Sequence, residues 1–339
     1  MITLEHVSKV FSPENQSIRA VDDVSFQVGE GELQVLIGPS GSGKTTTMRM
    51  INRLEAATDG RISIDGRDIR SLNIVDLRRG IGYVIQQGGL FPHFTFADNV
   101  AIVPLLLGWS RRRRRQRAEE LLELVGLPAD QFADRYPRQL SGGQQQRVGV
   151  ARALAVDPPI VLMDEPFGAV DPITRKQLQE ELRRIQAEVR KTVVFVTHDI
   201  SEAFTLGDRI VLMSEGRIIQ DGTPAELLRD PAEPFVTEFI GEDRALRALQ
   251  YTTLAELAGP APIHDPGNRL VLSGSLSVPA AARELAKVSE SADDGFWISD
   301  DQGKPTGYLG YQRLAAVLGE TVAPDGSGKP EEAAYAVSH

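Results

Sequence analysis

Short apolar runs alternate with helix-like patterns along the first 235 or so residues of the chain. Three of the runs are rich in β-branched residues and are bounded by turn-forming residues, as is typical of buried strands. They are ELQVLIG (32–38), PIVLMDE (159–165) and KTVVFVTHD (191–199). Strands separated by helical segments usually form a largely parallel sheet. The pattern therefore predicts an α/β fold with a parallel central sheet.

Two further segments alternate apolar and polar positions around a tight-turn pair. These pairs are Asp65-Gly66, within residues 60–69, and Glu215-Gly216, within residues 208–222. Alternation interrupted by such a pair predicts an antiparallel hairpin, and we expect both hairpins at the periphery of the fold.

The pattern changes near Gly241. Continuous apolar sequence becomes scarce beyond it, and residues 276–318 follow the order helix, strand, turn, strand, helix. The final residues have the composition of a disordered segment. The chain is therefore expected to contain a first domain over residues 1–240, a small α+β module over 241–320 and a disordered tail over 321–339.

Composition narrows the possible functions. The longest apolar run, residues 101–109, is far shorter than the ~20 residues of a membrane span. The start MITLEHVSKV lacks the pattern of a secretory signal, so a cytoplasmic location is expected. Zero cysteines exclude disulfides and thiolate metal sites, and a net charge of −10 disfavours a nucleic-acid partner. We interpret the arginine run at 111–117 as a solvated helix start rather than a site for lipid, nucleic acid or an acidic protein.

One segment has the chemistry of a phosphate cradle. Residues 38–45, GPSGSGKT, match the P-loop pattern G-x-x-x-x-G-K-[ST] between a predicted strand and a helical pattern. Glycines let successive backbone N–H groups point at phosphate oxygens near a helix N-terminus. We expect Lys44 to reach the β- and γ-phosphates, Thr45 to place its hydroxyl on Mg²⁺ and Thr46 to contact a nearer phosphate. The predicted cradle comprises Gly38, Pro39, Ser40, Gly41, Ser42, Gly43, Lys44, Thr45 and Thr46.

Acidic residues follow the second predicted strand. Asp164 is expected to hold Mg²⁺ through water, and Glu165 to polarise the water that attacks the γ-phosphate. Two metal ligands or a solvated pair are the alternatives. His198 follows the third predicted strand and is expected to sense the γ-phosphate; a structural histidine is the alternative.

A second glycine-rich loop, LSGGQ at 140–144, precedes a helical pattern. Its serine hydroxyl and backbone N–H groups form another anion site at a helix N-terminus. The triphosphate of one nucleotide is already assigned to the first cradle. The second loop therefore binds something else or faces a nucleotide carried by another chain, and the physical argument leaves both open.

In this order and spacing the motifs resemble those of the ATP-binding cassette (ABC) ATPases, over about residues 1–235. The resemblance implies a RecA-like parallel-sheet core, an antiparallel β subdomain and a helical subdomain. It also implies a homodimer paired head to tail, in which each signature loop closes over the ATP of the partner. The signature residues are Ser141, Gly142, Gly143 and Gln144.

The resemblance assigns further roles. Phe11 matches the aromatic residue that stacks on adenine, with a core phenylalanine as the alternative. Gln86 matches the loop glutamine that contacts Mg²⁺ and the attacking water, with Gln87 as the alternative. Asp171 keeps the D-loop aspartate, although GAVDP departs from the usual Ser-Ala-Leu-Asp. The segment from Gln86 to Val100 lies where the family docks its transmembrane permease subunits.

Local strings, including GYVIQQGGLFPHFT, resemble the ATPase subunits of osmoprotectant importers. The resemblance implies import of quaternary amines such as glycine betaine, carnitine, choline or proline betaine, with separate permeases and an extracytoplasmic substrate-binding protein. It places the chain peripherally at the cytoplasmic face of the plasma (inner) membrane. Residues 276–318 resemble one cystathionine-β-synthase-type (CBS) module, with a partial second copy at 249–263. This tail is expected to sense ionic strength or a nucleotide; a vestigial or purely dimer-stabilising module is the alternative.

Three other functions compete with this interpretation. An importer of another solute, such as a polar amino acid, fits the same motifs. A soluble ABC ATPase of DNA repair or translation usually carries coiled-coil insertions or two cassettes, which this chain lacks. A P-loop kinase would leave LSGGQ unexplained.

Overall fold

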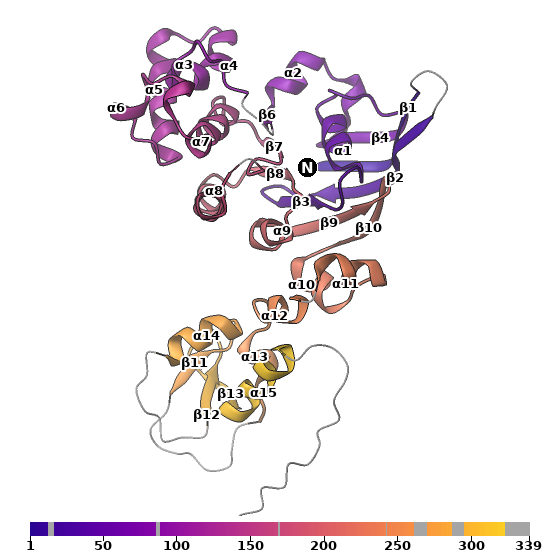
Figure 1. The fold of residues 1–339 in the computed structure, drawn as a ribbon, viewed down its shortest axis with the longest axis vertical. Helices are drawn as coiled ribbons and strands as arrows, with labels where there is room; N and C mark the ends of the chain where they lie inside the picture. The colour runs from indigo at the N-terminus through magenta and orange to yellow at the C-terminus, as the bar shows by residue number, and fades with distance from the viewer. Residues whose placement is uncertain are drawn as a thin grey trace, which may run out of the picture. The chain divides into compact units, whose positions relative to one another are not determined.

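The computed structural model describes residues 1–12, 17–85, 89–168, 170–241, 243–260, 270–286 and 295–322. The chain divides into two compact units, one ending at Val236 and the other beginning at Thr237 (Figure 1). Each unit has its own cluster of buried apolar side chains. Within the described ranges, every helix is too short or too polar to cross a bilayer.

The first unit is built on a six-stranded sheet in the order β10-β9-β3-β8-β7-β6. The strands from β9 to β6 are parallel, and β10 runs antiparallel to β9. All residues of β3, β7 and β8 are buried, because both faces of this part of the sheet are covered. The predicted parallel sheet is confirmed. The strands are β3 (Leu33–Ile37), β6 (Ile81–Val84), β7 (Ile160–Asp164), β8 (Thr192–Val196), β9 (Arg209–Ser214) and β10 (Arg217–Gly222).

Helices accompany this sheet in the alternation that the sequence predicts. Helix α8 begins after Asp171, whose side chain accepts a hydrogen bond from the Thr174 N–H, and Pro172 occupies its first turn. The helices of this part are α1 (Lys44–Ile51), α2 (Ile74–Arg79), α8 (Pro172–Val189), α9 (Ile200–Leu206) and α10 (Pro224–Arg229), with a 3₁₀ turn η1 at Ile69–Ser71. Helix α11 (Pro234–Ile240) contains the boundary between the two units.

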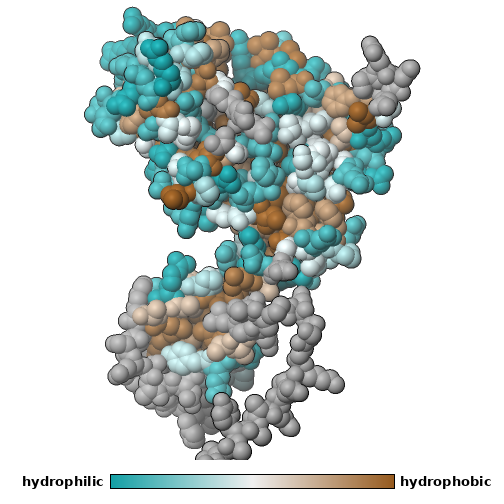
Figure 2. Space-filling view, viewed as in Figure 1, coloured by the Kyte–Doolittle hydropathy of each residue, from teal (hydrophilic) through white to brown (hydrophobic). Residues whose placement is uncertain are grey.

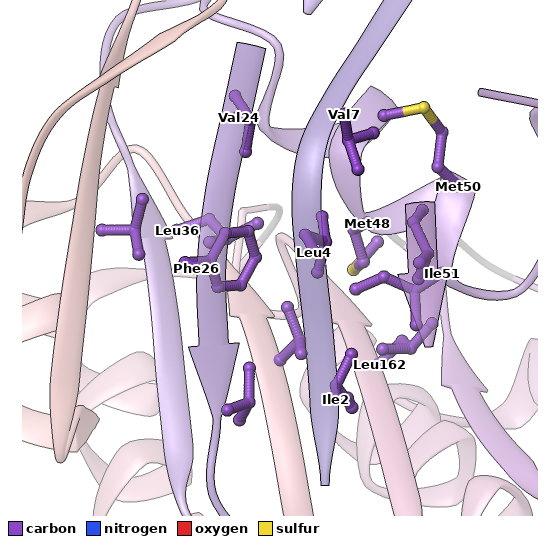
Figure 3. Close-up of a cluster of buried hydrophobic side chains, with 14 of the residues drawn as sticks. Ile2, Leu4, Val7, Val24, Phe26, Leu36, Met48, Met50, Ile51 and Leu162 are labelled. Atoms are coloured by element: carbon purple, nitrogen blue, oxygen red, sulfur yellow. The ribbon is translucent and has the colours of Figure 1, made fainter. Parts of the chain in front are cut away.

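A second, antiparallel sheet has the order β2-β1-β4-β5. The predicted hairpins at Asp65-Gly66 and Glu215-Gly216 are confirmed as the β4–β5 and β9–β10 pairs, whereas the long β1–β2 pair was not predicted. Side chains from β1 and β2, from α1 and from the parallel sheet form one buried cluster, which includes Leu4, Phe26, Met48 and Leu162 (Figure 3). The strands are β1 (Ile2–Phe11), β2 (Ile18–Val28), β4 (Asp59–Ile64) and β5 (Arg67–Asp68).

A group of helices lies between β6 and β7 in the chain. Helix α5 begins with the arginine run, where Ser110 caps the N-terminus, and it buries Ala118, Leu121 and Leu122. Hydrophilic side chains dominate the surface over α5 and α6 in Figure 2, which agrees with a solvated helix start. The helices are α3 (Phe96–Val100), α4 (Ile102–Leu106), α5 (Arg111–Leu124), α6 (Ala129–Phe132) and α7 (Gly142–Ala153), with a 3₁₀ turn η2 at Pro137–Gln139.

The second unit contains a three-stranded sheet, β11-β12-β13, in which β11 is parallel and β13 antiparallel to β12. The predicted order helix, strand, strand, helix is confirmed by α14, β12, β13 and α15, while β11 was missed. Residues 249–258, part of the suggested second copy, pack into the core of this same unit. The elements are α12 (Arg244–Ala248), α13 (Leu254–Leu257), β11 (Val271–Ser273), α14 (Val278–Leu285), β12 (Gly295–Ser299), β13 (Pro305–Gly310) and α15 (Tyr311–Val322). The CBS-like character and the predicted domain limits stay predictions, and residues 323–339 lie outside the described ranges.

Candidate nucleotide site

The P-loop follows β3 and leads directly into α1. Two of its glycines are required by their surroundings and not only by their positive φ angles. A Cβ on Gly38, at φ 151°, would collide with the Met213 carbonyl oxygen. A Cβ on Gly43, at φ 97°, would lie 2.5 Å from the carbonyl oxygen of Ala20. Strands β2 and β9 therefore brace the loop so closely that only glycine fits at these two positions.

The Lys44 side chain is held inside the loop and is 5% exposed. Its Nζ donates hydrogen bonds to the carbonyl oxygens of Gly38 and Pro39, both at 2.8 Å, and to Ser42 Oγ at 3.3 Å. Burial lowers the pKa of Lys44, while the charges of Glu165 and Asp164 act in the opposite direction. The loop thus curls around a cation, as expected of a cradle that receives phosphate oxygens.

Thr45 and Asp164 are brought together by the end of β7. Thr45 Oγ1 donates a 2.9 Å hydrogen bond to Asp164 Oδ1, and the Asp164 residue is 2% exposed. Burial raises the pKa of Asp164, whereas the Thr45 hydrogen bond and the positive charge of Arg49 lower it. The Arg49 Nη2 lies 3.7 Å from Asp164 Oδ2.

These two side chains offer the donors that Mg²⁺ prefers, a hydroxyl and a carboxylate oxygen. Among the described residues, no cluster of three or more His, Cys, Asp or Glu residues could form a closed metal cage. Mg²⁺ is ordinarily bound by one or two protein oxygens, with waters and substrate phosphates as the other ligands. Thr45 and Asp164 therefore fit this ion in chemistry and in number.

Glu165 and His198 form the next layer of the site. The Glu165 N–H donates to the Val196 carbonyl oxygen at 2.9 Å, which ties the residue to the end of β8. Its φ of 43° is unusual for a residue with a side chain, and such strain clusters at functional sites. The His198 Nδ1 lies 3.2 Å from Glu165 Oε2, and both side chains retain solvent access.

Other residues predicted for the site lie on separate elements. Ser141 caps α7, where its Oγ accepts from the Gln144 N–H at 3.3 Å while the Gln144 side chain accepts from the Ser141 N–H at 3.1 Å. Within the described part of the chain, this signature loop makes no hydrogen bond to the P-loop. Phe11 ends β1, with Lys9 Nζ 4.6 Å from the centre of its ring. Gln86 and Gln87 lie outside the described residues.

Sequence reasoning missed two arginines near the site. Arg49 follows Thr45 by four residues on α1, and this spacing puts the two side chains on one face of the helix. That spacing could have indicated its closeness to Asp164. Arg175, on α8, contacts Asp199 shortly after the end of β8. These contacts depend on the packing of α8 against α9, for which the sequence carries no comparable signal.

Comparisons with known proteins bear on this arrangement. A family described as ABC transporter matches residues 21–168. The osmoprotectant import ATP-binding protein OsmV of Salmonella typhimurium is 47% identical over 311 residues, which cover 91% of this chain and 79% of OsmV. The carnitine transport ATP-binding protein OpuCA of Listeria monocytogenes is 52% identical over 315 residues, which cover 93% of this chain and 76% of OpuCA. The choline transport ATP-binding protein OpuBA of Bacillus subtilis is 54% identical over 248 residues, and the matched part spans 64% of OpuBA.

A solved structure has the same fold. The dimeric, post-hydrolysis ATP-binding cassette MJ0796, bound to ADP and Pi, superposes with a TM-score of 0.59 at 38% identity and covers 66% of this chain and 98% of its own. The predicted P-loop ABC ATPase fold and the predicted similarity to osmoprotectant-importer ATPases are confirmed. The chain belongs to the family of ATP-binding, ATP-hydrolysing proteins of ABC transporters.

Proposed function

We propose that this chain drives the import of quaternary-amine osmoprotectants by hydrolysing ATP in a homodimer attached to separate permease subunits. The observation that carries the ATPase part is the convergence of Thr45, Asp164, Glu165 and His198 at the ends of β7 and β8 beside the P-loop. The solute class is supported by the names of relatives such as OsmV and the carnitine transporter OpuCA.

In this proposal the P-loop binds the phosphates of ATP. Backbone N–H groups of residues 38–46 face the phosphate oxygens, and Lys44 exchanges its carbonyl partners for the β- and γ-phosphates. Thr45 and Asp164 hold Mg²⁺, which when bound neutralises charge on the phosphate oxygens. Phe11 stacks on adenine through one face of its ring, while Lys9 makes a cation–π contact with the Phe11 ring.

Glu165 supplies the base. Its carboxylate lies beside His198 Nδ1, so the histidine limits the orientations that the carboxylate can adopt. Glu165 accepts the proton of the attacking water, and His198 contacts the γ-phosphate. Gln86, which lies outside the described residues, is assigned to the same water because it matches the loop glutamine of the family.

The signature loop completes the site of a second copy. Ser141 and the α7 N–H groups form an anion site that, in the described residues, has no hydrogen bond to the P-loop of the same chain. Pairing two copies head to tail puts each signature loop over the ATP of its partner, and a dimer is the form described for MJ0796. Each copy alone therefore holds only half of the phosphate-binding groups.

The permease docks on the segment after Gln86. Phe91 and Phe94 are exposed by 48% and 36%, and their ring centres lie 5.4 Å apart. The buried side chain of Asn99 holds this segment by hydrogen bonds to Phe91 N–H and to three carbonyl oxygens. A rigid, aromatic surface of this kind suits a protein partner. A permease bound there would hold the chain peripherally at the inner face of the plasma membrane.

The test of the ATPase part is Mg²⁺-dependent phosphate release by the purified chain across a range of protein concentrations. Specific activity should rise with concentration and should be lost in Ser141→Ala. Full activity of Ser141→Ala in a strictly monomeric preparation would overturn the shared site.

The test of the solute is uptake of labelled glycine betaine, carnitine and choline by cells that carry the complete transporter, with labelled polar amino acids in parallel. Uptake of an amino acid alone would replace the osmoprotectant assignment.

A further inference from the structure

Arg175 occupies the first turn of α8, next to the D-loop aspartate that caps this helix. Its backbone N–H donates to the Asp171 carbonyl oxygen at 2.8 Å. The side chain is 25% exposed. It therefore has less solvent to replace its partners than the exposed arginines further along the same helix.

The guanidinium of Arg175 reaches two loops at once. Its Nη2 donates to the Val170 carbonyl oxygen at 3.1 Å, and its Nη1 donates to Asp199 Oδ2 at 3.1 Å. The Nε lies 3.9 Å from Glu202 Oε1. One planar group thus connects the segment before α8 with the segment before α9.

Glu202, in the first turn of α9, is a buried acid within this network. The residue is 3% exposed. Its Oε2 accepts from Thr197 Oγ1 at 2.6 Å, and its Oε1 accepts from Gln179 Nε2 at 3.4 Å. Burial raises the pKa of Glu202, and the Thr197 hydrogen bond and the charge of Arg175 counteract that rise.

The same groups fix the backbone on both sides of His198. The Asp199 N–H donates to Thr197 Oγ1 at 3.0 Å, and Asp199 Oδ1 caps α9 by accepting from the Ser201 N–H at 2.8 Å. Thr197 and Asp199 are the two chain neighbours of His198. The direction of the histidine side chain therefore depends on residues that contact Arg175 directly or through Glu202.

We propose that Arg175 is a positioning residue that couples the D-loop segment Val170–Asp171 to His198 of the same chain. A guanidinium presents its donors in a rigid plane, so it satisfies Val170 and Asp199 together only while the two loops keep one spacing. The inference rests on the proposed function, in which two copies pair head to tail, and it takes the D-loop segment to lie at their contact. Closure of the dimer then sets the position of His198 through Arg175.

Arg175→Lys is the decisive variant. It keeps a positive charge near buried Glu202, so the uncompensated charge that would destabilise the fold is avoided. A lysine ammonium cannot reproduce the planar bridge between the two loops. Arg175→Gln, alone and combined with Glu202→Gln, separates loss of the bridge from the penalty of an unpaired buried acid. Arg183→Gln, exposed two turns further along α8, is the matched control.

Steady-state ATP hydrolysis, ATP binding and thermal melting are measured for each full-length variant. The expected result for Arg175→Lys is a fall of about tenfold in kcat, with KM for ATP within about twofold of the parent and an unchanged Tm. A purely structural role would instead lower Tm and reduce the active fraction without this split. Arg183→Gln should match the parent in all three measurements.

A double-mutant cycle with Asp171→Asn tests the coupling itself. Asparagine still caps a helix, so this change leaves α8 intact. If Arg175 carries the effect of the D-loop, adding Asp171→Asn to Arg175→Lys should lower kcat no further than either change alone. The inference would be overturned if the reductions in kcat caused by the two changes multiplied in the double variant, or if Arg175→Lys kept full kcat. A parent protein without ATPase activity would instead overturn the proposed function, so the two failures are distinguishable.

Discussion

His198 Nδ1 lies 3.2 Å from the Glu165 Oε2 carboxylate oxygen, because both residues follow neighbouring parallel strands. The register pairs Asp164 with Val196, and the Glu165 N–H donates to the carbonyl oxygen of that valine. The sheet therefore fixes the backbone of Glu165, and the segment after β8 brings His198 within reach of its carboxylate.

The first prediction concerns this base. Glu165→Gln preserves the size of the side chain and one acceptor oxygen but removes its ability to accept a proton. We expect turnover to fall by about 10²- to 10⁴-fold, the usual contribution of a general base, while ATP still binds and dimers still form with ATP. Phosphate release and light scattering with ATP check both parts. Undiminished hydrolysis would remove Glu165 from the mechanism.

The second prediction concerns the walls of the cradle. Gly38→Ala forces a methyl group against the Met213 carbonyl oxygen, at a φ that alanine rarely adopts. We expect binding of a fluorescent ATP analogue to weaken at least tenfold, with a lower Tm. Gly149→Ala on α7 is the control, because its added methyl group would meet no atom within 4 Å outside the helix backbone. Normal ATP binding by Gly38→Ala would show that the loop does not need this glycine.

Much of the site follows from local sequence, and the rest depends on packing. The runs that became β3, β7 and β8 are mostly apolar, so their burial could be predicted, as could the placing of Lys44 after β3 and of Asp164 at the end of β7. The β1–β2 pair was missed because its positions change register at bulges, which breaks the alternation. Strand β11 has only three residues, too few for a pattern.

The network of Arg175 lies beyond what a pattern can predict. Its partners come from the segment before α8 and the segment after β8, and no fixed spacing connects them. From the sequence alone, Glu202 is expected to be a solvated helical residue, yet the packing of α8 and α9 buries it. Packing of the two helices therefore decides the role of each.

The third prediction is a pH dependence of stability at Asp22. Hydrogen bonds from Arg19 and then from Arg217 hold the pKa of Asp22 below its usual range. A carboxyl with a lowered folded-state pKa stabilises the fold above its unfolded pKa of about 4, and this stabilisation is lost as the pH falls through the folded value. Asp22→Asn should therefore lower Tm at pH 7 and have a smaller effect near pH 3.

The position of Asp22 makes this measurement relevant to the cradle. Its N–H donates to the Gly216 carbonyl oxygen, and the Gly216 N–H donates to the Ser42 carbonyl oxygen, so the β9–β10 turn connects Asp22 with the P-loop. Glu5→Gln, at an exposed position of β1, is the control for charge alone. Equal effects of Asp22→Asn at both pH values would show that the two arginines do not stabilise the charged form.

The last prediction concerns the unit that begins at Thr237. Its core, which includes Leu254, Phe296 and Leu309, shares no residue with the cluster around Leu4 and Leu162 in the first unit. A chain ending at Gly241 should therefore retain ATP hydrolysis within about threefold of the full-length protein, since every residue assigned to the nucleotide site precedes that point. If the tail senses ionic strength, this shortened chain should lose the dependence of transport on added salt, measured as labelled-solute uptake at increasing KCl.

Phe296→Ala in the full-length protein, which opens the core of the second unit, should weaken the salt response as the truncation does, while the first unit keeps its Tm. An unchanged salt response in both proteins would reduce the tail to a scaffold, because neither its presence nor its packing would then affect the ATPase cycle.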